Sequence, residues 1–124
     1  AVPFAGPSDW SLLSTIKHDH PAYRQLIGYE PGTPAAEMKE ARKRKVSPAS
    51  YVSADDPPMM IVHGDADVTV PFAHAQSMVK RLKAAGVEVD LVTVKGGKHW
   101  VSGAGYPEAG NKAIPFIKKQ LKVK

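Results

Sequence analysis

The pattern of hydrophobic and polar positions is most regular in the second half of the chain. Residues 59–62 form a short continuous apolar run, which predicts a strand buried on both faces of a parallel sheet. Residues 71–85 carry apolar side chains at helical spacing and are followed by a glycine, so they predict a helix. Residues 87–94 are rich in β-branched side chains and predict a second strand, and residues 107–121 predict a last helix. Strand, helix, strand, helix is the order typical of βαβ units.

Prolines interrupt the first half, where only short helices fit. Three are expected, over residues 10–17, 21–28 and 33–45. The third is strongly charged and is expected at the surface. Residues 1–4 resemble the end of a further strand.

Length and composition bound the domain organisation. The 124 residues are 43% hydrophobic and 23% charged, which is typical of one compact globular domain. We therefore expect a single domain over residues 1–124, with a helical, cap-like insertion over residues 6–50 and a strand–helix portion over residues 51–124. Cysteine is absent, which excludes disulfides, thiolate metal sites and cysteine nucleophiles.

The net charge of +5 raises the question of a nucleic-acid partner. The basic side chains gather in residues 39–45 and 118–124, and neither group is interleaved with aromatic side chains that could stack on bases. Solvated helix faces are therefore favoured over nucleic-acid binding. No run of 18 apolar residues and no signal-peptide pattern is present, so no membrane span is expected, and the localisation is not indicated.

Two polar loops follow the two predicted strands, where open α/β sheets place their active sites. The first, HGDADVTVP, contains Asp67, and the second, KGGKHW, contains His99. A carboxylate beside an imidazole holds the ring in one tautomer and stabilises it as it accepts a proton. Asp67 and His99 are thus the candidate catalytic pair, although Asp67 could instead cap the following helix. Asp65 is expected to form hydrogen bonds within the loop, and His63 is expected to be structural.

These two motifs resemble the acid and histidine motifs of the α/β-hydrolase superfamily, in its esterase, lipase and prolyl-oligopeptidase-like branch. Residues 47–89 follow that branch in their order of features, and the GPSD segment over residues 6–9 is similar to one common in bacterial members. The resemblance implies a partial α/β-hydrolase fold with about three parallel strands flanked by helices. It implies an acyl-enzyme route with His99 as general base and acid, Asp67 as its orienting carboxylate, and no metal or organic cofactor.

The nucleophile motif of that superfamily, G-x-S-x-G, is missing from the sequence. Ser8 has Trp10 where the second glycine is required, and Ser102 shares a loop with His99. Because the chain order in the superfamily is nucleophile, acid, histidine, we expect the serine to lie before Ala1. The chain is then expected to be the C-terminal portion of a serine hydrolase and to be inactive alone. The implied substrate is a small ester, with a peptide or carbohydrate ester as alternatives.

Trp10 and Trp100 are candidate substrate-binding residues, although Trp100 could equally pack its own loop. If residues 6–50 form part of a cap over the substrate, Leu13, Tyr23 and Tyr29 are candidate pocket walls together with Trp10. His18 and His20 lack a third ligand at suitable spacing, and no metal site is expected there. His74 is expected to be exposed. The rival interpretation is a non-catalytic interaction module that forms homo-oligomers through the unpaired edge of its N-terminal strand.

Overall fold

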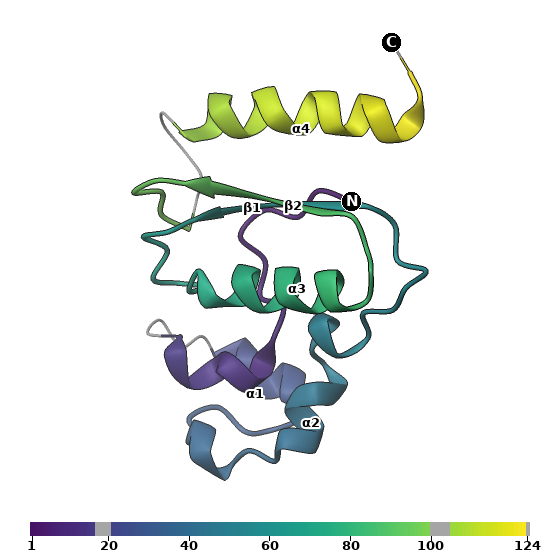
Figure 1. Cartoon of the computed structure of the whole chain (residues 1–124). Coiled ribbons are helices and arrows are strands. Elements are labelled where there is room, and N and C mark those ends of the chain that lie inside the picture. The colour runs from purple at the N-terminus through teal and green to yellow at the C-terminus, as the bar shows by residue number, and fades with distance from the viewer. Residues whose placement is uncertain (17–20, 100–104, 124) are drawn as a thin grey trace.

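The structure, a computed structural model, describes residues 1–16, 21–99 and 105–123 of the chain. A two-stranded sheet lies between helices α3 and α4, and a set of short helices lies beyond α3 (Figure 1). The described elements in chain order are η1 (Trp10–Thr15), α1 (Pro21–Ile27), η2 (Ala35–Glu37), α2 (Glu40–Lys45), η3 (Pro48–Ser50), β1 (Met59–Gly64), α3 (Ala73–Ala84), β2 (Val89–Val94) and α4 (Gly105–Leu121).

The strands β1 and β2 are parallel, and their register runs from Met59 opposite Val89 to Gly64 opposite Val94. The N-terminal segment lies on the other edge of β1, where Phe4 forms an isolated parallel bridge with Val62. The expectation of about three parallel strands is therefore met by two strands and one bridge. Pro3 explains the difference, because it has no N–H to donate to a sheet ladder.

Both faces of β1 are buried, as its continuous apolar run predicts. The face toward α4 holds Met60 and Val62, which pack with Phe116. The face toward α3 holds Ile61, which packs with Leu82. Alternate side chains of a strand point to opposite faces, so this one strand contributes to two cores.

The helical portion over residues 6–50 has a core of its own, built from Trp10, Leu13, Ile16, Ile27 and Met38. It differs from the sequence prediction in two places. The first helix is a 3-10 helix, and the expected helix over residues 33–45 is divided into η2 and α2. Met38 and Lys39 between them are extended, which carries the Met38 side chain into this core. Burial of one large apolar side chain outweighs the helix propensity of the two linking residues.

Candidate active site

Two loops meet at the carboxyl ends of the parallel strands. Residues 65–72 follow β1, and residues 95–99 follow β2. Their backbones touch, because the Ala66 N–H donates to the Gly97 carbonyl at 3.0 Å. A Cβ on Gly64 would collide with the same carbonyl, so glycine is required at that point. Asp65 adds a side-chain link, as its Oδ1 accepts the Gly96 N–H at 2.6 Å.

Asp67 is buried in the loop that follows β1. Its Oδ1 accepts the backbone N–H groups of Thr69 and Val70, each at 2.9 Å. This pattern is an Asx turn, which fixes the side chain against its own backbone. The alternative that Asp67 caps the following helix is wrong, because Thr69 and Val70 precede α3, whose N-cap Phe72 has no side-chain hydrogen bond. The second oxygen, Oδ2, is directed away from these backbone groups.

His99 lies against that second oxygen, with Nδ1 3.0 Å from Asp67 Oδ2. An ionised carboxylate accepts hydrogen bonds and cannot donate them. In the neutral ring, the proton is therefore on His99 Nδ1, and Nε2 is the basic nitrogen. The His99 side chain is 29% exposed, whereas the Asp67 side chain is fully buried. The structure brings together the two residues that the sequence singles out, with the carboxylate inside and the imidazole at the surface.

A second imidazole reaches the same carboxylate, which the sequence did not predict. His63 is buried in β1, and its Nε2 lies 2.8 Å from the Val70 carbonyl and 3.2 Å from Asp67 Oδ2. The ring of Phe72 packs edge-on against it. One sequence feature was consistent with this contact, namely that His63 precedes Asp67 by only four residues.

The prediction that His74 is exposed is wrong, since this side chain is fully buried in α3. Its Nδ1 accepts the Asp9 N–H at 3.3 Å, and its carbonyl accepts the Ser8 hydroxyl at 2.6 Å. Burial lowers the pKa of the His74 imidazole, and the nearby Asp9 carboxylate only partly opposes this. The GPSD segment therefore attaches the helical portion to α3, and a helical pattern alone could not show that attachment.

Asp9 completes this attachment. Its Oδ1 accepts the hydroxyl of Ser11, and its Oδ2 accepts the hydroxyl of Ser77 in α3, both at 2.6 Å. Burial raises the pKa of the Asp9 carboxyl, but these hydrogen bonds outweigh it and the net shift is downward.

The candidate substrate-binding residues that the structure describes lie in the helical core and not beside the Asp67–His99 pair. Trp10 is buried in the helical core beside Tyr23, with ring centroids 5.1 Å apart, and Leu13 and Tyr29 belong to the same core. Little of the Trp10 surface is left for a ligand, so its role in binding stays a prediction. Trp100, Ser102, His18 and His20 lie outside the described residues.

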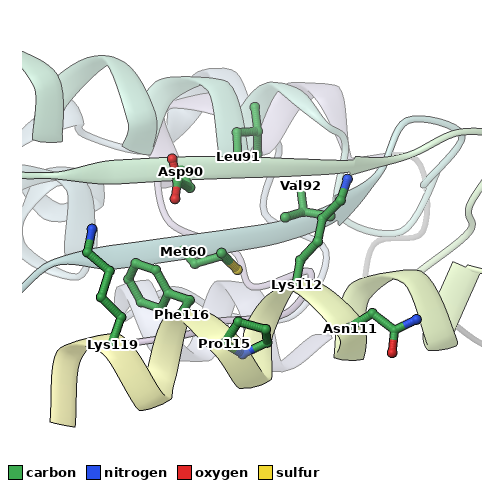
Figure 2. A pocket seen from close by; sticks show the side chains of 9 residues that line it. All are labelled: Met60, Asp90, Leu91, Val92, Asn111, Lys112, Pro115, Phe116 and Lys119. Atoms are coloured by element: carbon green, nitrogen blue, oxygen red, sulfur yellow. The ribbon is translucent and has the colours of Figure 1, made fainter. Parts of the chain in front are cut away.

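A groove of about 710 Å³ lies away from the Asp67–His99 pair, between α4 and the sheet (Figure 2). Met60 and Phe116 are among its lining residues, and the Lys112 and Lys119 side chains extend from α4 toward the strands. Among residues 1–16, 21–99 and 105–123, no cluster of three or more potential ligands could hold a metal ion. None of the helices in that part of the chain has the length and hydropathy needed to cross a membrane.

Comparison with known proteins finds that the prolyl oligopeptidase family matches residues 1–124. A probable carboxylic ester hydrolase of Mycobacterium tuberculosis, LipM, is 33% identical over 85 residues, which are 67% of this chain and 19% of LipM. An uncharacterized peptidase of Bacillus subtilis, YuxL, is 31% identical over 71 residues, which are 57% of this chain and 11% of YuxL.

Among solved structures, a truncated form of a carbohydrate esterase from gut microbiota superposes with a TM-score of 0.78 and 27% identity. The match covers 96% of this chain and 41% of the esterase. The chain therefore spans less than half of the length of each of these three relatives.

Proposed function

Because the chain belongs to the prolyl oligopeptidase family, whose fold is that of the α/β-hydrolases, we propose that it supplies the acid and the base of a serine hydrolase. One observation carries the proposal. Asp67 Oδ2 and His99 Nδ1 lie 3.0 Å apart, on loops at the carboxyl ends of neighbouring parallel strands. In open α/β sheets this is where catalytic groups converge.

His99 acts as general base and then as general acid. Its Nε2 takes the proton from a serine hydroxyl as the serine oxygen bonds to the substrate carbonyl carbon. The same proton passes to the leaving alcohol as the ester C–O bond breaks, and a water repeats the sequence to release the acid. Asp67 keeps the His99 proton on Nδ1 and stabilises the imidazolium, while its buried position keeps water from weakening that interaction.

The serine comes from a segment of the same fold outside these 124 residues, since no G-x-S-x-G occurs within them. The proposed substrates are carboxylic esters, because the names of LipM and of the carbohydrate esterase both describe ester cleavage. Peptides are the second candidate class, on the likeness to the peptidase YuxL.

The test compares this chain with a version extended at its N-terminus by the residues encoded upstream. The 124-residue chain should hydrolyse p-nitrophenyl butyrate no faster than an imidazole background, and the extended version should show saturable turnover. In the extended version, Asp67→Asn should lower kcat about 10⁴-fold. Asp90→Asn is the matched control, because that exposed carboxylate lies in β2, where Asp90 pairs with Met60 near the opposite end of the sheet. An extended enzyme that keeps its rate in Asp67→Asn would contradict the proposal.

A non-catalytic association module is the second candidate function. It rests on the apolar side chains left exposed on α4, where Ile114, Ile117 and Leu121 recur at helical spacing and are 58%, 41% and 66% exposed. Phe4, next to the open edge of the sheet, is 43% exposed. A second copy of the chain could cover these side chains through a two-fold contact.

A further inference from the structure

A buried histidine that the proposed reaction does not use lies beside the candidate acid. His63 contacts the Val70 carbonyl and Asp67 Oδ2 through one ring nitrogen, Nε2, at 2.8 Å and 3.2 Å. A peptide carbonyl and an ionised carboxylate both accept hydrogen bonds and cannot donate them. The His63 Nε2 therefore carries a proton, which it donates to the Val70 carbonyl while Asp67 Oδ2 lies beside the same N–H group.

The charge of this ring follows from its other nitrogen. The His63 Nδ1 is buried and has no hydrogen-bond partner among the residues that the structure describes. A charged imidazole would place a buried N–H there without an acceptor, which is unfavourable away from water. His63 is therefore a neutral ring with its proton on Nε2.

The hydrogen bonds to Asp67 divide into two sets. Its Oδ1 accepts two backbone N–H groups of its own loop, and its Oδ2 accepts from His99 on one side and faces His63 Nε2, 3.2 Å away, on the other. The loop bonds alone leave the carboxylate able to tilt about its Cβ–Cγ bond. The His63 N–H restricts that rotation, because the ring is held by the sheet and by the Val70 carbonyl and places this positive end of a dipole 3.2 Å from Oδ2.

We propose that His63 is a positioning residue: its neutral ring, bonded through Nε2–H to the Val70 carbonyl, holds that N–H beside Asp67 Oδ2, keeps this oxygen directed toward His99 and so determines which nitrogen of His99 is protonated. This inference rests on the proposed function, in which Asp67 orients His99. Its consequence is measurable in the 124-residue chain. In water a neutral imidazole favours the Nε2–H tautomer. A dominant Nδ1–H tautomer of His99 therefore reports its hydrogen bond to Asp67.

The experiment measures the tautomers of the histidine rings by long-range ¹H–¹⁵N correlation NMR at pH 8.5. In the unmodified chain, His63 should be Nε2–H and His99 mainly Nδ1–H. His63→Gln retains an N–H donor near the Nε2 position, whereas His63→Met has nearly the same shape and no donor. We expect the Nδ1–H fraction of His99 to be unchanged in His63→Gln and to fall at least twofold in His63→Met. Amide protection of β1 and β2 checks that the fold is retained.

The outcomes separate this inference from its premise. If His99 is mainly Nε2–H in the unmodified chain, the Asp67–His99 pair itself is wrong. If that pair is present but His63→Met leaves the His99 tautomer unchanged, His63 has no positioning role. If His63→Met does not fold, His63→Asn replaces it, since its shorter side chain moves the donor away from Nε2. A charged or Nδ1–H state of His63 in the unmodified chain overturns the inference whatever the variants do.

Discussion

At the scale of single residues, the candidate site depends on how closely two backbones approach. Gly64 ends β1 against the carbonyl of Gly97, and this contact holds the Asp67 loop against the His99 loop. A side chain at Gly64 would separate the loops, and Asp67 Oδ2 would then no longer reach His99 Nδ1. A Cβ at Gly97 would instead collide with Val94 at the end of β2. The geometry of the candidate site therefore depends on the absence of a Cβ at Gly64 as well as on its polar groups.

Gly64→Ala tests that contact. Its methyl group collides with backbone, which cannot rotate aside, so we expect the free energy of unfolding to fall by about 3 kcal/mol. The Nδ1–H tautomer of His99 should be lost in the same variant. Urea denaturation followed by circular dichroism measures the first effect. Gly110→Ala is the control, since a Cβ there meets no atom within 4 Å and alanine favours α4 by about 1 kcal/mol. Equal stability of the two variants would contradict the expectation.

His74 makes the stability depend on pH. Burial lowers the pKa of His74 in the folded chain below its ordinary value of 6.5, so below pH 6.5 the unfolded chain binds a proton that the folded chain does not. The free energy of unfolding should therefore fall as the pH drops below 6.5, by up to about 1.4 kcal/mol per pH unit from this group. His74→Asn retains an acceptor for the Asp9 N–H and does not titrate. Urea titrations between pH 5 and 8 should show a flatter profile for this variant, and identical profiles would exclude His74 as the cause.

At the scale of elements, hydroxyl groups join the short helices to one another and to the strand–helix portion over residues 51–124. The Ser8 and Ser77 hydroxyls connect the GPSD segment to α3. The Ser47 hydroxyl accepts the Trp10 N–H at 2.8 Å and donates to the Lys43 carbonyl at 2.8 Å, which joins η1 to the end of α2. Small polar side chains allow this close approach, because they satisfy backbone groups without taking core volume.

Ser47→Ala should break the second of these links. The buried Trp10 N–H would lose its acceptor, which costs about 1–3 kcal/mol. Tryptophan fluorescence during urea denaturation reports the loss, since Trp10 lies in the affected core. Ser50→Ala, at an exposed position of the neighbouring turn, should change the free energy of unfolding by less than about 0.5 kcal/mol. A similar small effect for Ser47→Ala would mean that water replaces its hydroxyl.

At the scale of the whole molecule, the sheet is small and one of its edges is lightly protected. Residues 1–5 provide a single bridge beside β1, and apolar side chains of α4 face outward. The solved carbohydrate esterase has the same fold, and this chain matches only 41% of it. The rest of that esterase is additional structure that these 124 residues do not contain. By itself the chain exposes surface that another protein surface can cover.

We expect the isolated chain to form a dimer at micromolar concentration, with a mass twice that of the monomer by multi-angle light scattering. Ile117→Glu should dissociate it, because a charge would be buried at the contact. Leu26→Glu is the control, as this leucine is also exposed, at 55% against 41% for Ile117, but lies on α1 in the helical portion. A monomer in the unmodified chain, with no binding of an apolar dye, would exclude the association module.

The sequence by itself determined the elements of the second half and the two residues proposed for catalysis. Periodicity decides these, because a buried strand and an amphipathic helix each impose a local pattern, and the loops with Asp67 and His99 follow from where the strands end. The tertiary structure alone decided the contact of His63 with Asp67, the burial of His74, the division of the helix over residues 33–45, and the placement of Trp10 in a core. These features depend on contacts between residues far apart in the chain, such as Asp9 with His74. A local sequence pattern does not indicate which distant group will form a hydrogen bond with a polar atom or bury a side chain.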